Sequence, residues 1–369
     1  MSGLTRFIQS LDIFSFLATI TLACIGILFI YSATYTYTCP YSVYFIKQII
    51  GVGLGIIIYL IFCFIDFRTL CRWGYFIYFF IILLLIFTLI KGTIGMGAQR
   101  WIDMKLFKFQ PSELAKLFLP PFIVYYLQGE RNTHKRTFKT FVPLLVTILI
   151  SFLLILKQPD LGTALIILIS SLILLWCAGL SNKFFVILAC ISLISAPIFY
   201  KCLKPYQQKR IEVFFGAGDQ HRERYHVEQS KIAIGSGGIF GKGFLQGTQN
   251  RLAFLPERRT DFIFSVLCEE WGFLGATIIL LLYVSLILYL FFAIIQIQSF
   301  FTQLLALGLL IPIALSIIIN LGMVIGLLPV VGIPLPLMTC GISHLWINFA
   351  ALGWINGIIS RRSTSQSSW

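Results

Sequence analysis

The sequence has little charge and few acidic residues. Only 11% of its 369 residues are Asp, Glu, Lys or Arg, against about a quarter in water-soluble domains. Hydrophobic residues make up 58%, and the mean hydropathy is +0.92. This composition excludes a water-soluble globular protein and predicts a chain embedded in a membrane. Its apolar runs of about twenty residues do not alternate with polar positions, which favours membrane-spanning helices over a closed barrel.

Patterns for metal or redox chemistry are missing as well. None of the nine cysteines forms a C-x-x-C pair, and none lies beside a histidine at the spacing of metal ligands. The four histidines form no set with a carboxylate, so zinc chemistry is not expected. No cofactor is indicated by the sequence, although a divalent cation, Mg²⁺ or Mn²⁺, could assist chemistry on a phosphate-bearing substrate. A nucleic-acid partner is not expected.

What the chain does contain is a series of apolar stretches. They predict an all-α polytopic membrane protein with about ten transmembrane helices, in which residues 1–369 form a single domain. The expected spans cover residues 11–32, 44–65, 75–91, 111–128, 141–157, 161–179, 183–200, 262–295, 303–326 and 343–360. The eighth span is long for one crossing, so we expect it to tilt or to begin outside the hydrocarbon.

Basic residues in the short connections predict the orientation. Arg68 and Arg72 follow the second span, and residues 129–140 carry four Lys and Arg. Because Lys and Arg collect on the cytoplasmic side, both termini are expected in the cytoplasm. The 201–261 loop, between the seventh and eighth spans, is then extracytoplasmic. It holds eleven basic residues against six acidic ones, which indicates an anionic ligand, a solvated surface or contact with lipid headgroups.

Asp261 is the main candidate for chemistry. It lies where this loop enters the eighth span, directly after Arg258, Arg259 and Thr260. An aspartate there can cap the first turn of the helix, a role that Thr260 can equally fill. A carboxylate at a membrane boundary can instead mark a substrate path and deprotonate a hydroxyl nucleophile. The residues alone leave both interpretations open.

Two further acidic residues fall at the same expected membrane depth. Glu113 follows Pro111 and Ser112, which is typical of a helix N-terminus, and Lys116 is its i,i+3 neighbour. This pair either joins helices as a structural ion pair or lines a cavity. Asp160 lies in a tight turn and can cap the helix that follows. Three acidic residues from separate loops at one depth are more than scattered capping predicts.

Two segments are unsuited to regular helix. Residues 235–247 contain six glycines, a backbone able to cradle phosphate, although a flexible turn is the simpler interpretation. Residues 326–337 contain three prolines and two glycines, so we expect an extended or re-entrant segment covered by protein or by a wet cavity. Three charges inside the spans, Lys47, Glu269 and Glu270, are expected to belong to ion pairs.

These segments together resemble the SEDS family of polytopic cell-wall proteins, which contains RodA, FtsW and SpoVE. The matching pieces are GAQRWI, FQPSELAKL, QPDLGTA, GSGGIFGKGFLQGTQNRLAFLPERRTDFIF and GLLPVVGIPLPL. They occur in family order over residues 90 to 345. The piece GKGFLQGTQNRLAFLPER is closer to RodA, the elongation member, than to FtsW. The resemblance implies a multi-pass protein of the bacterial cytoplasmic membrane.

The resemblance also implies an activity and a site. It implies a peptidoglycan glycosyltransferase that polymerises lipid II on the outer face of the membrane and releases undecaprenyl diphosphate. Asp261 matches the family's essential aspartate, Glu113 and Lys116 its cavity pair, Asp160 the acid of QPDLG, and Arg100 the arginine beside tryptophan. The expected catalytic residue is therefore Asp261. The expected substrate-binding residues are Arg100, Glu113, Lys116, Asp160, Lys242, Arg258 and Arg259.

The resemblance implies partners and leaves other functions open. Family members work with a class B penicillin-binding protein, a transpeptidase, so this partner is expected together with lipid II, undecaprenyl-linked glycan and membrane lipids. A lipid II flippase is an alternative, as are a septal, FtsW-like division polymerase and a catalytically silent scaffold. A flippase predicts charges deep in the bundle, whereas the charges singled out here fall at the outer boundary.

Two positions depart from the family pattern. The family commonly reads His-Thr-Asp where this chain has Arg259-Thr260-Asp261. After PLPL it commonly has Ser-Tyr-Gly-Gly-Ser-Ser, and this chain has Thr339-Cys340-Gly341-Ile342-Ser343-His344 instead. Replacement of a glycine by Ile342 removes backbone freedom, so we expect a changed geometry where the last span begins.

Overall fold

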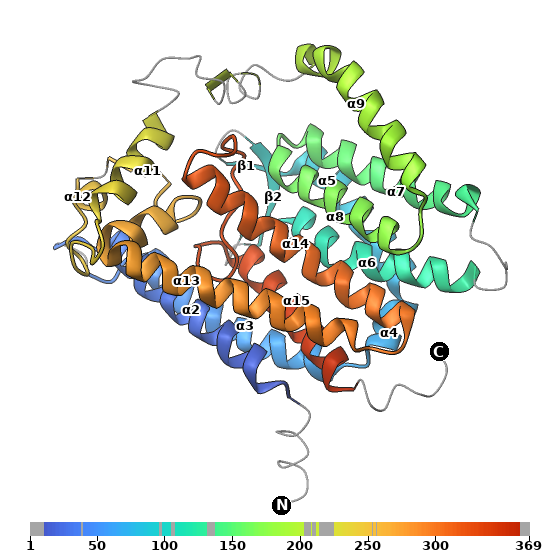
Figure 1. Ribbon diagram of the computed structural model, residues 1–369, viewed down its shortest axis with the longest axis horizontal. Helices are drawn as coiled ribbons and strands as arrows, with labels where there is room; N and C mark the ends of the chain where they lie inside the picture. The colour runs from blue at the N-terminus through green and yellow to red at the C-terminus, as the bar shows by residue number, and fades with distance from the viewer. Residues whose placement is uncertain are drawn as a thin grey trace, which may run out of the picture.

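The computed structural model describes residues 11–37, 40–95, 98–104, 108–130, 137–202, 208, 212–213, 225–252, 254–255 and 257–361. Its regular structure within these ranges is almost entirely helical (Figure 1). The helices in chain order are α2 (Ile13–Thr34), α3 (Val43–Phe64), α4 (Phe67–Arg72), α5 (Gly74–Lys91), α6 (Pro111–Gly129), α7 (Phe138–Lys157), α8 (Leu161–Cys177), α9 (Asn182–Cys202), α11 (Tyr225–Ser236), α12 (Thr248–Arg251), α13 (Ile263–Ile295), α14 (Phe300–Val324) and α15 (Ile342–Ser360).

The helices confirm a polytopic membrane protein. Seven of those described, α2, α3, α5, α7, α13, α14 and α15, are long and apolar enough to cross a membrane. Each of the ten predicted spans overlaps one helix. The count of ten crossings stays a prediction, because α6, α8 and α9 are not among these seven: α8 has only 17 residues, and α6 and α9 contain internal prolines.

Helix α15 lies at the centre of the bundle, and 83% of its apolar stretch is buried. It packs most closely against α3, and two glycines make that approach possible. A Cβ on Gly353 would lie 2.2 Å from the carbonyl oxygen of Tyr59, and one on Gly357 would lie 2.3 Å from that of Cys63. Backbone contact along this seam holds α15 in the interior and fixes the position of its first turn.

A small antiparallel sheet lies in the 92–110 connection, where the sequence predicted only a loop. Its order is β1 (Thr93–Gly95), β2 (Ala98–Asp103) and β3 (Lys108–Phe109). The Ser343 hydroxyl donates to the carbonyl of Lys108 at 2.9 Å and so joins the sheet to the start of α15. Strands β1 and β3, of three and two residues, are too short to show the alternation by which strands are predicted, and the six residues of β2, AQRWID, do not alternate between apolar and polar positions.

Helix α13 is broken at Gly272, which has φ +66° and ψ −162°. The glycine-rich segment packs across the break: Phe273 N–H donates to Gly238 at 2.8 Å, and Leu274 N–H donates to Ile239 at 3.1 Å. The predicted eighth span is therefore two helical pieces rather than one straight helix. Figure 1 shows α11 and α12 beside the first piece of α13. The end of the bundle that holds these three helical segments is called the Asp261 end below.

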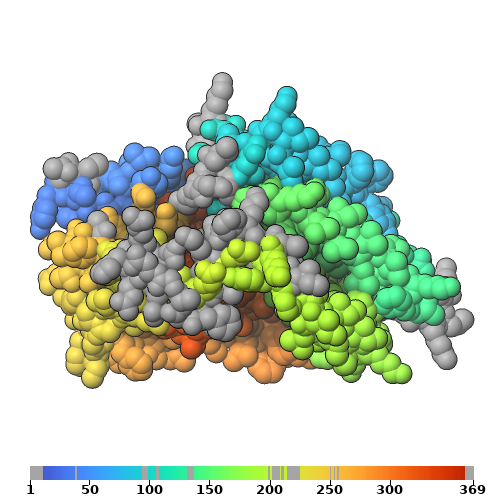
Figure 2. All heavy atoms as spheres, turned by 90° about the horizontal axis from the view of Figure 1, so that it is seen from above, coloured from blue at the N-terminus to red at the C-terminus, as the bar shows by residue number. Residues whose placement is uncertain are grey.

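Helix α9 runs along the outside of the bundle, away from α15 (Figures 1 and 2). Its side chains include Leu193 and Ile194, which are 76% and 79% exposed. Exposed aliphatic side chains on a helix of a membrane protein are suited to contact with lipid.

Candidate functional site

The segment between α14 and α15, residues 326–341, organises the Asp261 end. It forms neither helix nor strand over most of its length, as its prolines predict, and Ile333 and Leu335 are buried within the protein. Gly162, at the start of α8, lies against it, because a Cβ there would be 2.8 Å from the Val331 carbonyl oxygen. On its other side, the tip of the segment at Gly332 adjoins Asp261.

Asp261 ends a tight turn that leads into α13. The first helical residue is Ile263 and the N-cap position is Phe262, so neither Asp261 nor Thr260 occupies the capping position. Thr260 instead donates from its hydroxyl to the Glu257 carboxylate at 3.2 Å. Glu257 has φ +48°, a left-handed conformation that costs energy in a non-glycine residue. The turn therefore projects Asp261, which is partly exposed, instead of using it to begin a helix.

Helix α14 fixes the backbone on both sides of this carboxylate. The side-chain amide of Asn320 donates to the carbonyl of Asp261 at 3.0 Å and to that of Ile333 at 2.7 Å. Gly332 has φ +75°, and a Cβ on it would lie 3.5 Å from Oδ2 of Asp261. The carboxylate thus adjoins a bare glycine backbone, with no side chain between it and the segment.

Basic groups surround the same turn. The Arg259 guanidinium lies 4.0 Å from the ring centroid of Tyr44 on α3, and its carbonyl accepts from Cys340 N–H at 2.9 Å. Burial raises the pKa of the Cys340 thiol, while the charges of Arg259 and Lys47 lower it. Burial and the neighbouring Arg259 lower the pKa of the Arg258 guanidinium. Positive charge therefore collects beside Asp261.

The prediction that Lys47 belongs to an ion pair is wrong. It is exposed, and within the part of the chain that the structure describes it has no ion-pair partner. A lysine at a helix end can reach water with its ammonium group, so it does not need a buried counter-charge.

Asp160 serves both as a cap and as a charged partner. Its Oδ1 accepts from Thr163 N–H at 3.2 Å and so caps α8, and the same oxygen lies 3.3 Å from the Arg100 guanidinium. Its other oxygen accepts from the Gln110 amide at 2.6 Å. The Arg100 guanidinium also lies 4.5 Å from the Trp101 ring centroid. The capping interpretation is confirmed, and Asp160 in addition ties β2 and the start of α6 to α8.

Glu113 and Lys116 form a buried ion pair, as their spacing predicts. Lys116 Nζ lies 2.8 Å from Oε2 of Glu113, and both side chains are less than 10% exposed. His344 Nδ1 lies 3.1 Å from the same oxygen. His344 therefore links this pair on α6 to α15, as a structural ion pair would, and Lys116 also borders a cavity.

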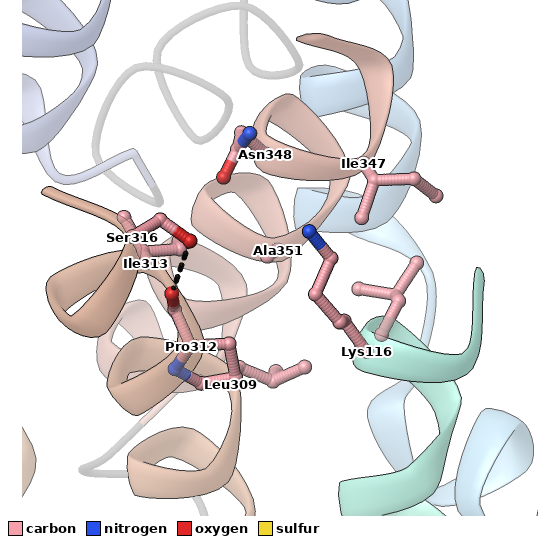
Figure 3. Close-up of a pocket in the computed structure, with 9 residues that line it drawn as sticks. Lys116, Leu309, Pro312, Ile313, Ser316, Ile347, Asn348 and Ala351 are labelled. Atoms are coloured by element: carbon pink, nitrogen blue, oxygen red, sulfur yellow. Dashed lines mark hydrogen bonds between the residues drawn. The ribbon is translucent and has the colours of Figure 1, made fainter. Parts of the chain in front are cut away.

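Figure 3 shows this cavity, with the Lys116 ammonium group directed between Ile347 and Asn348. The cavity measures about 20 Å³, and Ser316 on α14 also lines it. A space of this size holds about one water molecule. The cation thus faces a small, mostly apolar space between α6, α14 and α15, to which Ser316 and Asn348 contribute polar groups.

Lys242 is paired with α13 rather than with the Asp261 turn. Its ammonium lies 2.8 Å from Oε1 of Glu269, which is fully buried. The same oxygen accepts from the Thr248 hydroxyl and from Gln249 N–H, each at 3.0 Å. The prediction that Glu269 belongs to an ion pair is confirmed.

The glycine-rich segment uses its backbone amides to bind α13. The N–H groups of Lys242 and Gly243 donate to the carbonyls of Glu269 and Glu270, each at 3.0 Å. Leu245 N–H donates to the Glu270 carboxylate at 3.3 Å. Amides engaged in this way are not available to cradle a phosphate, so the segment is a clasp over the break in α13.

The structure brings Glu113, Asp160 and Asp261 to one end of the bundle, as the sequence predicted. It also adds residues that sequence reasoning missed, namely Asn320, Gln110, Tyr44 and the contact of His344 with Glu113. His344 carried a signal, because it lies in the stretch that departs from the family pattern, and Gln110 lies within the matching piece FQPSELAKL. Asn320 and Tyr44 are single polar residues in apolar helices and gave no comparable signal.

A family model for FtsW, RodA and SpoVE, described as a cell cycle protein, matches residues 13–364. The chain belongs to the FtsW/RodA/SpoVE family. It is 37% identical over 318 residues to the peptidoglycan glycosyltransferase MrdB of Escherichia coli K12, a match that covers 86% of this chain and 85% of that protein. It is 34% identical to the stage V sporulation protein E of Bacillus subtilis, over 93% of this chain and 95% of that protein.

Solved structures of this FtsW/RodA/SpoVE fold agree with the arrangement described above. A chain from a peptidoglycan synthase complex, described as coordinating polymerization and crosslinking, superposes with a TM-score of 0.81 at 27% identity, covering 97% of this chain and 99% of that one. The rod shape determining protein RodA of Thermus thermophilus gives a TM-score of 0.71 at 27% identity, with 97% and 98% covered. The polytopic helical fold is therefore that of the family.

Proposed function

We propose that this chain is a peptidoglycan glycosyltransferase that polymerises lipid II, and that Asp261 is its general base. The peptidoglycan glycosyltransferase MrdB, 37% identical over 86% of this chain, supports the enzyme class. The observation that carries the role of Asp261 is its placement. It is a partly exposed carboxylate outside the capping position, held at its backbone by Asn320 and bordered by Gly332.

The proposed reaction uses that placement. The Asp261 carboxylate accepts the proton of the acceptor sugar hydroxyl, and the hydroxyl oxygen forms a bond to the anomeric carbon of the donor glycan. The bond between that carbon and the diphosphate oxygen breaks, and undecaprenyl diphosphate leaves with the electron pair. Attack from the face opposite the leaving group inverts the anomeric carbon.

The basic groups beside Asp261 are suited to the diphosphate. Arg258 and Arg259 lie within three residues of the base, and Arg259 is held against Tyr44. Fixed positive charge aimed at a leaving group stabilises the negative charge that develops there. Arg100 and Lys116 are the second pair of cations in the substrate-binding set, and each is already oriented by a carboxylate, Asp160 or Glu113.

The described residues do not build a cation site. No three His, Cys, Asp or Glu among them lie together, and Asp160 and Glu113 are already engaged by basic partners. Any divalent ion would have to be held largely by the substrate's own phosphate oxygens. No step of the proposed reaction is assigned to it.

Lipid II is a membrane-bound substrate, and its use requires a matching orientation and partner. We place the Asp261 end at the outer face of the bacterial cytoplasmic membrane and both termini in the cytoplasm, because the basic short connections follow the opposite helix ends. A class B penicillin-binding protein is the proposed partner, supported by the fold shared with a chain of a peptidoglycan synthase complex. Likeness to MrdB and RodA favours elongation over septal division.

The test is polymerisation of labelled lipid II by purified protein with its transpeptidase partner. Asp261→Asn, which keeps the shape and removes the charge, is expected to lower the rate about a hundredfold or more. Asp66→Asn is the matched control: Asp66 caps α4 at the opposite end of the bundle, and asparagine also caps. The proposal fails if Asp261→Asn polymerises at the wild-type rate. Lipid II transport in liposomes without polymer formation would favour a flippase.

A further inference from the structure

The second half of helix α3 carries an open apolar groove. The groove measures about 480 Å³ and is lined by one stripe of side chains, Ile57, Leu60, Ile61, Phe64 and Ile65. Ile57, Ile61 and Ile65 are 53%, 48% and 37% exposed, so the groove can be reached from outside the protein. Every side chain that lines it is hydrocarbon, and its occupant must therefore be apolar along this length.

The groove is short and lies far along α3 from the proposed base. From residue 57 to residue 65 the helix rises about 12 Å, which is less than the roughly 15 Å of hydrocarbon in one leaflet of a bilayer. Tyr44, in the first turn of α3, is the residue that contacts Arg259 beside Asp261. The groove therefore belongs to the leaflet opposite the Asp261 end, and its length suits an acyl chain of a phospholipid rather than a much longer polyprenyl chain.

A guanidinium group lies at the end of this groove. Arg361, directly after α15, donates from Nη1 to the carbonyl of Ile65 at 3.0 Å and from Nη2 to that of Phe64 at 2.6 Å. Both acceptors belong to residues that line the groove, and the bond to Ile65 is exposed. Carbonyl groups carry no net charge, so these bonds leave the guanidinium cationic. Positive charge is thus held where the apolar lining ends.

The surroundings of Arg361 are basic on balance. Helix α4 begins just after the groove and carries Arg68 and Arg72, against one acidic residue, Asp66, at its N-cap. Trp73, which follows α4, is 56% exposed, and tryptophan is typical of the interface between membrane and water. Basic residues at such an interface attract the headgroups of anionic lipids. An apolar groove with a basic end is complementary to an anionic phospholipid.

We propose that this groove binds an anionic glycerophospholipid, with an acyl chain along α3 and the phosphate beside Arg361. The simpler interpretation is that Arg361 only caps the last carbonyls of α3 and that the groove contacts any lipid. Capping requires N–H donors, whereas selection of an anionic headgroup requires the charge, so the two interpretations can be separated. With the orientation proposed above, the bound lipid belongs to the cytoplasmic leaflet.

The test measures binding of fluorescent phosphatidylglycerol and phosphatidylethanolamine to the full-length protein in detergent. The wild type should bind the anionic lipid about fivefold more tightly, the effect of one basic residue near an anionic headgroup. Arg361→Gln keeps an N–H donor for the α3 carbonyls, removes the charge and should abolish this preference. Lys139→Gln is the matched control, because it removes the same charge from an exposed position on α7, outside the groove, and should keep the preference.

A second variant tests the groove itself. Ile61→Trp fills it from an exposed position, so the fold should be kept and both lipids should bind more weakly. Ile187→Trp, at a position of α9 that is 57% exposed, should weaken neither lipid. Both pairs of variants are compared in the same assay.

The inference is overturned if the wild type binds both lipids equally, if Arg361→Gln keeps the preference, if Lys139→Gln loses it, or if Ile61→Trp binds phosphatidylglycerol as the wild type does. Displacement of phosphatidylglycerol by undecaprenyl phosphate, or by the transpeptidase partner, would also overturn it, because the groove would then belong to a polyprenyl carrier or to a helix of that partner. These assays involve no turnover, so their outcome is independent of the role of Asp261.

Discussion

The side-chain amide of Asn320 donates a 3.0 Å hydrogen bond to the backbone carbonyl of Asp261. Its second donor bonds the carbonyl of Ile333 at 2.7 Å, and the residue is fully buried in α14. One amide therefore holds together the turn that bears the proposed base and the extended segment beside it. Neither of these backbone pieces is held by a regular hydrogen-bonded ladder at that point.

Asn320→Leu is expected to lower both activity and stability. Leucine has a similar volume but removes this donor from the carbonyls of Asp261 and Ile333, and loss of the buried bond to Ile333 alone costs about 1–3 kcal/mol. We expect a lower thermal midpoint in detergent and a polymerisation rate reduced at least tenfold, because displacement of Asp261 by about 1 Å is costly to catalysis. Ser151→Ala, which removes a buried hydroxyl bonded to Tyr78, should lower the midpoint and leave the rate unchanged. Equal rates for both variants would contradict the role of Asn320.

The sequence predicts much of this site, because several of its features are local. Pro111 marks the start of α6, and the i,i+3 spacing of Glu113 and Lys116 puts the two side chains on one face. The capping role of Asp160 also depends only on the turn that contains it. Asn320 is different: it is one amide in a 25-residue apolar helix, and its two partners come from segments on either side of that helix in the chain. Such a contact depends on tertiary packing, which no local pattern reports.

The glycine-rich segment is a second feature whose binding role could not be predicted from the sequence. Its glycines suggest a phosphate cradle, but the Lys242 and Gly243 amides bind α13. The sequence could not indicate this use, because the acceptors become available only where α13 breaks at Gly272. A glycine-rich pattern reports that a backbone is accessible, and the tertiary fold decides what that backbone binds.

Because Lys242 pairs with Glu269, substitution of Lys242 tests whether this residue stabilises the fold or contacts the substrate. Lys242→Met leaves the buried Glu269 charge without its cation, a change that typically costs about 3–5 kcal/mol. We expect a clearly lower thermal midpoint and reduced activity. In the double variant Lys242→Met with Glu269→Leu the unpaired charge is gone, so stability and most of the activity should return. A stable but inactive double variant would show instead that Lys242 contacts the substrate.

The two roles of Asp160 can be separated by two substitutions. Asp160→Asn keeps an oxygen that can cap α8 and loses the charge that faces Arg100, whereas Asp160→Ala loses both. Loss of the cap costs about 1 kcal/mol, so Ala should have a lower thermal midpoint than Asn. If the charge orients Arg100 toward the substrate, both variants should lose polymerisation activity to a similar degree. An active Asn variant beside an inactive Ala variant would restrict Asp160 to capping.

The break in α13 depends on Gly272. Its φ of +66° and ψ of −162° lie in a region that is essentially restricted to glycine. A Cβ there would lie 2.2 Å from the Gly241 nitrogen and 2.6 Å from the Ile239 carbonyl oxygen, and both of these neighbours are backbone atoms. Gly272→Ala therefore cannot be accommodated by a side-chain rotation, and either the clasp or the helix must move.

We expect Gly272→Ala to accumulate poorly or to show a large fall in thermal midpoint, with loss of polymerisation. Gly235→Ala is its matched control, because a Cβ at that position would meet nothing within 4 Å. Gly235 lies in α11, where alanine favours helix by up to about 1 kcal/mol, so this variant should be as stable as the wild type or slightly more so. Because α13 begins two residues after Asp261, a stable Gly272→Ala protein with normal activity would show that the clasp does not fix the position of the catalytic turn.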